Sequence, residues 1–464
     1  PQQYDRGGAI VANVQQNTVS LYGVTYPIIG KVRRQVISQF PAKIVMGDMS
    51  RSDQQNVSEW VISDLTGGAG IENIDERADV QRFWYTDGLW TLDKYGIYLA
   101  PLVSSLGQIQ TLTPNPNLFL VGFKGKLYLT ASSIIYRWNT TTRVWDEVYD
   151  IPGTPLSVAV YGSNLLVSTE VAVYYSSTGD SGSWAAASGS PTSSLMTLFD
   201  DKLVLNTILA LKYTTDISTW TTVINLATRM SALSSPNGII TIRGAENRDE
   251  LIVMSYDDGI YSVDFWTGKM YKIIDTESTP YADLGANMYN YRGDLLIPAG
   301  VSLLKLSGST LSDISMAKDG GLPSGEDARI KSLMSLGDLI IAAAGRSITV
   351  WSGVGWHKIY QGSSGNSIYG LGTSVGSTDG ALGSYVGRVD ITSNRIAFFF
   401  ADGSGSTYTV KYIEMPYLAK RPIKTPGFAF VSSGTLFTGD FDASFANWDK
   451  LFTSLEVTAS QMTA

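Results

Sequence analysis

The chain contains no cysteine among its 464 residues and a single histidine, His357. The lack of cysteine excludes disulfides, thiolate metal sites and cysteine nucleophiles, so stability must come from burial and strand pairing. One histidine leaves Ser-His-Asp catalysis and multi-histidine metal sites with no more than one candidate residue. Because His357 follows Trp356 at the end of a repeat unit, we expect a packed or surface side chain.

Charged residues are also scarce, at 16% of the chain, and acidic residues outnumber basic ones by 42 to 34. The net charge is −8, and no basic cluster alternates with aromatic residues as a nucleic-acid groove would require. No apolar stretch reaches the roughly 18 residues needed to cross a bilayer, and residues 1–8 are polar, unlike a signal peptide. We therefore expect neither a nucleic-acid partner nor a membrane span.

The chain is rich in glycine, tyrosine and tryptophan, with 46, 25 and 11 residues, a profile typical of β-rich, turn-rich proteins. Between residues 79 and 417 one unit recurs eight times, and in each a Leu or Ile follows a polar turn-like pair and opens an apolar strand. Successive anchors are 38 to 57 residues apart, a period typical of propellers and solenoids. The anchors are Leu89, Leu127, Leu165, Leu203, Leu251, Leu295, Leu339 and Ile396.

Each unit predicts four short strands. A short apolar run, such as residues 119–123, precedes the anchor, which then starts a strand that returns from a hairpin. A third strand follows, such as residues 134–136, and then a fourth that is marked in most units by an aromatic residue such as Trp145. Four antiparallel strands in about 40 residues make one propeller blade. The sequence predicts an all-β fold, a β-propeller of seven or eight four-stranded blades.

Three regions follow from where the repeat begins and ends. Residues 1–78 lack the repeat, and we expect an N-terminal extension that packs on or closes the propeller of residues 79–417. Residues 79–85 are the best candidate for a strand that closes the ring against the last blade. Residues 418–464 are predicted to be a linker followed by either the start of a β-sandwich-like module or an extension that docks on a partner, because so few short strands cannot enclose a core of their own.

Segments on both sides of the propeller resemble a known class of proteins. Residues 41–48 read Pro-Ala-Lys-Ile-Val-Met-Gly-Asp, with Trp60 and Gly67-Gly68 after them, and residues 434–441 read Gly-Thr-Leu-Phe-Thr-Gly-Asp-Phe, followed by Trp-Asp-Lys-Leu-Phe. With the propeller, they resemble large structural proteins of tailed-bacteriophage virions. The resemblance spans most of the chain and includes no catalytic motif. It implies a component of an extracellular particle, assembled in the host cytoplasm, that contacts other virion proteins, copies of itself and, as a further candidate, a host-surface glycan.

Residues 175–184 and 213–220 are similar to the Asp-box hairpin of sialidase-like propellers, but each is one residue short before its Trp. In such hairpins the Asp ties a turn together and the Trp packs between strands, so we interpret both as structural. Sialidase chemistry would also need clustered arginines and a Tyr nucleophile partnered by Glu. The arginines here share no blade position.

Two other motifs have a structural interpretation as well. Asp257-Asp258 before Gly259 could hold Ca²⁺ if backbone carbonyls converged, but most such pairs make a hydrated turn. Residues 361–372 imitate a phosphate-binding loop without its following helix or its Lys-Ser/Thr, and we expect an inserted loop that explains the 57-residue spacing. The sequence predicts no catalytic, cofactor-binding or metal-binding residue and no cofactor.

Two functions compete. The leading one is a non-enzymatic structural component of a bacteriophage virion, in the tail, whose propeller is a rigid platform for contacts with other subunits or the host surface. Assembly contacts are then expected in residues 1–78 and 418–464. The alternative is a carbohydrate-binding or sialidase-like glycoside hydrolase propeller on a microbial surface, which would bring acidic and aromatic residues together in one deep pocket.

Overall fold

A computed structural model describes residues 18–21, 24–27, 65–70, 73–74, 82–94, 96–111, 118–192, 194–226, 236–243, 250–275, 284–316, 329–336, 338–373, 395–416, 429–437 and 440–441. All the regular secondary structure within these ranges is β-strand, as the composition predicts. Within these ranges no helix has the length and apolar character that crossing a membrane would require.

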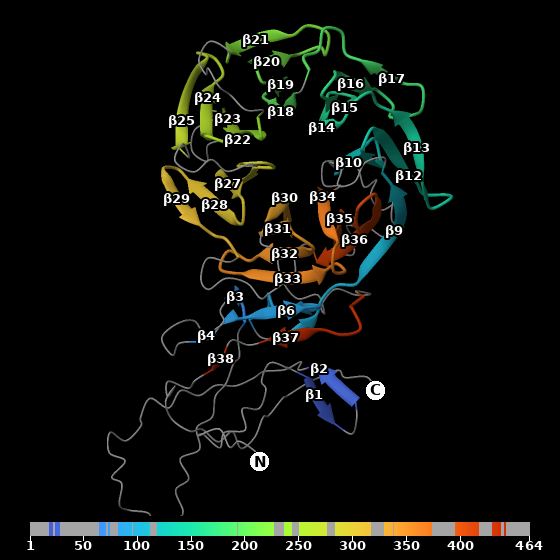
Figure 1. Cartoon of the computed structure of the whole chain (residues 1–464), viewed down its shortest axis with the longest axis vertical. Coiled ribbons are helices and arrows are strands. Elements are labelled where there is room, and N and C mark those ends of the chain that lie inside the picture. The colour runs from blue at the N-terminus through green and yellow to red at the C-terminus, as the bar shows by residue number, and fades with distance from the viewer. Residues whose placement is uncertain are drawn as a thin grey trace, which may run out of the picture.

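Seven sheets of four strands each make up the propeller (Figure 1). The first three blades consist of β10 (Leu118–Phe123), β11 (Lys126–Ala131), β12 (Ile134–Asn139), β13 (Val144–Asp150); β14 (Pro155–Tyr161), β15 (Asn164–Thr169), β16 (Val173–Ser176), β17 (Trp184–Ala186); and β18 (Leu195–Phe199), β19 (Lys202–Asn206), β20 (Ala210–Thr214), β21 (Thr221–Asn225). The next three consist of β22 (Gly238–Arg243), β23 (Glu250–Tyr256), β24 (Gly259–Asp264), β25 (Lys269–Asp275); β26 (Tyr289–Tyr291), β27 (Asp294–Ala299), β28 (Ser302–Ser307), β29 (Thr310–Asp313); and β30 (Ile330–Leu336), β31 (Leu339–Ala344), β32 (Ser347–Trp351), β33 (Trp356–Gln361). Blade 7 consists of β34 (Ser367–Thr373), β35 (Arg395–Ser404), β36 (Thr407–Pro416) and β9 (Val103–Gln110).

The repeat anchors identify the second strand of every blade. Seven of the eight lie at its first or second position, from Leu127 in β11 to Ile396 in β35. The exception is Leu89, which lies in β7 (Leu89–Trp90) and pairs with β8 (Tyr98–Leu99) in a separate two-stranded sheet. The fold is therefore a seven-bladed propeller.

The ring is closed by β9, which precedes all the other blade strands in the chain. It pairs antiparallel with β36, from Thr407 opposite Gln110 to Ile413 opposite Val103. The expectation that residues 79–85 close the ring was wrong. Hydrophobic pattern did not reveal β9 because an outermost strand buries little of its surface, and in β9 only Leu106 and Ile109 are buried.

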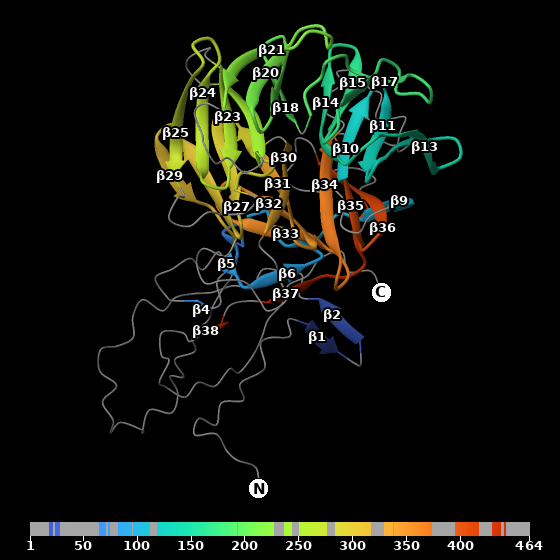
Figure 2. The ribbon, with the colours of Figure 1, turned by 45° about the horizontal axis from the view of Figure 1, so that its top comes forward.

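The core lies between blades. The first strand of each blade contacts the first strand of the next, and β34 contacts β10, so the seven first strands surround the central axis (Figure 2). Side chains alternate between the two faces of a strand, so each sheet packs against both of its neighbours. Leu106, Leu129 and Phe399, for example, join blade 7 to blade 1.

Residues 361–372 do not form the expected inserted loop. Gln361 is the last residue of β33, and residues 367–372 belong to β34, the first strand of blade 7. The additional length of this unit falls on residues 374–394, which lie outside the described residues. Glycines within the run suggested a loop, although Gly370 and Gly372 occupy positions in a strand.

The described residues within 65–101 and 429–441 form a second unit, which we call the base. Within it β3 (Gly68–Ala69) pairs with β5 (Arg82–Phe83), β6 (Tyr85–Asp87) with β37 (Thr435–Phe437), and β4 (Asn73–Ile74) with β38 (Asp440–Phe441). Its small core contains Leu65, Phe83, Leu89, Ile97 and Leu436. Segments from before and after the propeller thus share one hydrogen-bonded unit.

The base lies against the outer strand of blade 6. Strands β3, β6 and β7 all contact β33, and Figure 1 shows β6 next to β33 with β37 on the other side of β6. The approach is close enough that a Cβ on Gly355 would overlap the carbonyl oxygen of Gly67. Gly68, with φ +84°, would bring a Cβ 2.5 Å from the Trp356 nitrogen. Glycine is therefore required on both sides of this contact.

We expect Ile109→Ala in β9 to lower the free energy of unfolding by about 2 to 5 kcal/mol, because it leaves a cavity in the seam between blades 7 and 1. Urea unfolding followed by tryptophan fluorescence measures this change. The control is Gln108→Ala on the exposed side of the same strand, which should change stability by less than about 0.5 kcal/mol. Equal stability of the two variants would contradict the closing role of β9.

Candidate functional site

The Asp-box-like segment at residues 175–184 forms a tie between blades. Its carboxylate, Asp180, accepts a hydrogen bond from Lys126 Nζ at 3.1 Å and is also bound by Arg137, both from blade 1. The hydrogen bond from Lys126 is the main cause that lowers the pKa of Asp180 below its usual range. Trp184 is 8% exposed and stacks on Tyr149 with ring centroids 5.7 Å apart. The Trp of this motif is packed, as expected, whereas the Asp ties its turn to blade 1 instead of tying the turn to itself.

The second such segment, residues 213–220, is a turn held by its own Asp216 and joined to the preceding blade through its Trp. Asp216 Oδ1 accepts hydrogen bonds from the backbone nitrogens of Ser218 at 2.8 Å and Thr219 at 2.7 Å. These bonds to the ionised form lower the pKa of Asp216. Trp220 Nε1 donates to the carbonyl oxygen of Ser188 in blade 2 at 3.0 Å. Both polar groups therefore serve the scaffold.

The arginines are dispersed, as their spacing predicts. Arg137 pairs with Asp180 between blades 1 and 2, and Arg292 pairs with Asp338 between blades 5 and 6. Arg229, Arg248 and Arg388 lie outside the described residues. Of the arginines that the structure describes with their partners, none shares a carboxylate-binding position with another.

The central axis offers no acid–base pair in the strands that surround it. The seven first strands, β10, β14, β18, β22, β26, β30 and β34, are all described and contain no Asp, Glu or His. One of their cross-blade polar contacts joins two neutral groups, Thr197 Oγ1 and Thr241 Oγ1, at 3.3 Å. Lys331 Nζ lies 3.1 Å from the hydroxyl of Tyr369 and 4.2 Å from the centre of its ring. These strands supply no pair of carboxylates for glycoside cleavage.

His357 is a buried packing residue. It is 0% exposed between blade 6 and the base, its Nδ1 lies 2.6 Å from Thr91 Oγ1, and its ring lies 6.0 Å from that of Phe83. The sequence predicted a packed or a surface histidine, and the structure shows a packed one. Its partners come from the base, which the position of His357 after Trp356 did not predict.

Asp257 and Asp258 form the turn between β23 and β24. Asp257 Oδ1 accepts from Asn237 Nδ2 at 2.8 Å, and Asp258 Oδ2 accepts from the Tyr261 hydroxyl at 2.5 Å and lies 3.3 Å from Lys272 Nζ. Neutral donors and a lysine thus engage one oxygen of each carboxylate, Asp257 Oδ1 and Asp258 Oδ2, within a turn. Across the described ranges no cluster of three His, Cys, Asp or Glu side chains could hold a metal.

Sequence analysis missed a buried polar cluster between blades 6 and 7. Asp402 is 2% exposed, and its Oδ2 accepts from Lys411 Nζ at 2.6 Å and from the Tyr360 hydroxyl at 2.5 Å. Asn366 Nδ2 donates to its other oxygen at 2.9 Å. Burial, and then the hydrogen bond to Asp402, raise the pKa of Tyr360. Three strands, β33, β35 and β36, and the segment before β34 meet here, so no local spacing could reveal the cluster.

This cluster connects to the base through a second set of contacts. Gln361 Oε1 accepts from Lys358 Nζ at 3.0 Å and is also bound by the Tyr85 hydroxyl. Lys358 Nζ lies 3.4 Å from the centre of the Tyr85 ring. Polar side chains of blade 6 therefore hold both blade 7 and the base. We interpret this arrangement as structural.

We expect Asp402→Ala to destabilise the protein by about 3 to 5 kcal/mol, because it leaves Lys411 without its buried carboxylate. Asp201→Ala is a matched control. Its Lys202 partner lies at the same 2.6 Å, but the Asp201 side chain is 77% exposed, and solvent screens such pairs. Chemical unfolding should show a large decrease in the free energy of unfolding for Asp402→Ala and no resolvable decrease for Asp201→Ala. Equal shifts would show that burial is not what gives the cluster its strength.

Alkaline pH should weaken the fold through buried tyrosines. Burial raises the pKa of Tyr256 to about 12, so between pH 10 and 12 the unfolded chain loses this proton before the folded one does. The stability contributed below pH 10 is then lost as pH rises, by about 1 kcal/mol at pH 11 for this group. Urea unfolding at pH 9 and 11 should show a smaller drop for Tyr256→Phe than for the parent. Tyr271→Phe, an exposed position, should leave the drop unchanged, and an identical drop in all three proteins would contradict the assignment.

Neither a protein-family model nor a curated protein matches the sequence. Among solved structures, the extracellular domain of a putative one-component system from B. thetaiotaomicron is similar, with a TM-score of 0.48 and 12% identity over 67% of this chain and 40% of that one. The extracellular domain of a putative hybrid two component system from the same organism gives 0.46 and 12%, over 66% and 39%. This chain therefore spans well under half the length of either. The likeness carries no argument about function, and the seven-bladed fold rests on the strand pairing described above.

Proposed function

We propose that the chain is a non-enzymatic structural component of a tailed-bacteriophage virion, in the tail, with the propeller as a rigid platform for contacts with other subunits or with the host surface. The base is the observation that carries this proposal. Gly67-Gly68 and residues 434–441, which carry part of the resemblance to virion proteins, lie together in it. A unit made from both flanking segments holds the propeller through blade 6 and leaves the other outer strands for contacts.

Backbone hydrogen bonds join the two chain segments of the base, and the rigidity that they give supports its role in a platform. Leu102 N donates to Ala429 O at 2.9 Å and Val431 N to Ala100 O at 3.0 Å, so the two segments of the base are paired by backbone up to the start of β9. Trp84 N adds a bond to Phe437 O at 3.0 Å. Backbone pairing of this kind fixes orientation more firmly than side-chain contacts alone, since it does not depend on rotamers.

The alternative of a glycoside hydrolase finds no support at the axis. Its chemistry needs a carboxylic acid of raised pKa near a second carboxylate or a Tyr–Glu pair. The described first strands carry neither, and the buried Asp402 is engaged by Lys411, Tyr360 and Asn366 between two blades. The charged groups described so far act as ties between elements, which favours the structural role.

Peptide mass spectrometry of tailed particles, purified on a density gradient from a lysate of the strain that carries the gene, tests the proposal. We expect the protein to sediment with the particles in a constant ratio to other particle proteins. Gly355→Ala, whose Cβ overlaps Gly67 O, should detach the base and reduce incorporation at least tenfold. Val354→Ala, at an adjacent side chain that is 65% exposed, is the control and should be incorporated normally.

Two results would overturn the proposal. One is recovery of the protein only as a free species outside the particles. The other is release of fluorophore from a fluorogenic glycoside by the purified protein, because that would establish an enzyme. Retention of the propeller's unfolding transition in Gly355→Ala must accompany the loss of incorporation, so that detachment is distinguished from global unfolding.

A further inference from the structure

Two aromatic side chains among the described residues stand out by their exposure. Trp266 is 73% exposed and Tyr271 is 57% exposed, whereas the other described Trp, Tyr and Phe side chains are buried or half-buried. A single exposed apolar residue needs no explanation by itself. Trp266 differs because its ring is fixed and because charged groups surround it.

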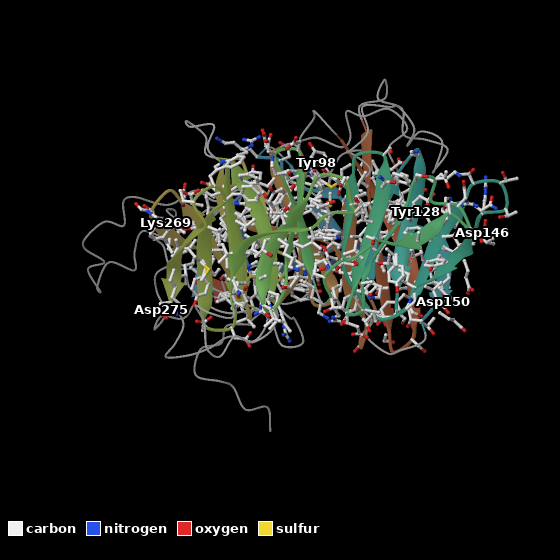
Figure 3. All side chains as sticks on the ribbon, turned by 90° about the horizontal axis from the view of Figure 1, so that it is seen from above. Tyr98, Tyr128, Asp146, Asp150, Lys269 and Asp275 are labelled. Atoms are coloured by element: carbon white, nitrogen blue, oxygen red, sulfur yellow. The ribbon has the colours of Figure 1, made fainter. Side chains whose placement is uncertain are left out.

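The turn that carries Trp266 is rigid. Asp264 Oδ1 accepts from the backbone nitrogens of Trp266 at 3.0 Å and Thr267 at 3.2 Å, and Thr267 Oγ1 donates to Asp264 Oδ2 at 2.6 Å. The hydrogen bonds from Thr267 lower the pKa of Asp264, so the carboxylate that holds the turn stays ionised. Lys269, labelled in Figure 3, is the first residue of β25 and follows this turn.

Aromatic neighbours support the indole from one side. The Trp266 ring lies 5.2 Å from that of Phe265 at 88° and 6.3 Å from that of Phe199 at 64°. Phe199 and Phe265 are themselves stacked at 4.6 Å and nearly buried. A flat apolar surface is thereby held in place before any ligand arrives, which reduces the entropy lost on binding.

Charged groups of blade 3 border the ring. Lys202 Nζ lies 5.4 Å from its centroid, 2.6 Å from Asp201 Oδ1 and 3.5 Å from Asp200 Oδ2. The side chains of Asp200 and Asp201 are 64% and 77% exposed. An ionised carboxylate has about four acceptor positions, so these two can accept bonds from a ligand while they hold Lys202.

The position of Trp266 repeats that of Asp180. Lys126 and Lys202 are each the first residue of the second strand in their blade, and each reaches the turn between the third and fourth strands of the next blade. In blade 2 that turn presents the carboxylate of Asp180. In blade 4 it presents the indole of Trp266, so the same tie leaves a broad aromatic surface directed outward.

We propose that Trp266, with Lys202, Asp200 and Asp201, forms a stacking subsite for one neutral pyranose unit of a surface glycan. The C–H face of a pyranose is apolar and packs on an aromatic ring, while its hydroxyls need acceptors and donors at the rim. Two carboxylates and a chain charge of −8 repel anionic sugars and phosphates. The inference rests on the proposed function, since it assigns the host-surface contact of the platform to blades 3 and 4.

Saturation-transfer-difference NMR of the purified chain with maltotriose, chitotriose, lactose and sialyllactose at millimolar concentration tests this subsite. At least one neutral oligosaccharide should receive saturation, with a dissociation constant in the millimolar range expected of a single subsite. Trp266→Ala should weaken binding at least tenfold, Trp266→Tyr should retain part of it, and Asp201→Asn should weaken it several-fold. Thermal unfolding confirms that each variant is folded.

Tyr271→Ala removes the other exposed aromatic of blade 4 and is the matched control; it should leave binding unchanged. The inference is overturned if no neutral oligosaccharide is saturated, if sialyllactose is preferred, or if Trp266→Ala and Tyr271→Ala have equal effects. Incorporation of Trp266→Ala into particles is measured separately. Normal incorporation together with lost glycan binding separates failure of the subsite from failure of the proposed assembly role.

Discussion

The pairing of β9 with β36 is the constraint on which the structure depends. Without it blade 7 would have three strands, and the surface that Leu106 and Ile109 cover between Phe399 and Leu129 would face water. A ring of blades gains its stability from having no open end, because each sheet is then packed on both faces. The same segment also positions the base, since Pro101 bridges to Phe430 immediately before β9 begins.

The repeat was predictable because each blade obeys a local rule. A polar turn followed by an apolar strand recurs at Leu127, Leu165 and their equivalents, and a strand that is buried on both faces must carry such a run. The strand β9 does not obey the rule. Its sequence, Val-Ser-Ser-Leu-Gly-Gln-Ile-Gln, suits an outer strand with one covered face and resembles a loop to any pattern based on hydrophobicity.

The sequence could not predict the base or the polar contacts between blades, for another reason. The strands of the base are two or three residues long, and two of its strand pairs, β6 with β37 and β4 with β38, join segments that lie hundreds of residues apart, as with Tyr85 and Phe437. Asp402 and Lys411 look like surface residues of a hairpin until blade 6 is placed against them. Trp266 belongs to the same class, because composition and spacing gave no means to separate an exposed indole from the many packed ones. Sequence patterns report local periodicity, whereas these features arise from contacts between distant segments.

The order of strands along the chain has a consequence for how the molecule is made. During synthesis from the N-terminus, β9 leaves the ribosome before every other blade strand, while its partner β36 appears only after six complete blades have followed. Thr111, at the end of β9, bonds to Ser406 across 295 residues. The six internal blades can pair from neighbouring strands, but the ring cannot close until its last quarter has been translated, and long-range pairing of this kind slows folding. Until that moment β9 is an unpaired strand that the nascent chain must keep from other partners.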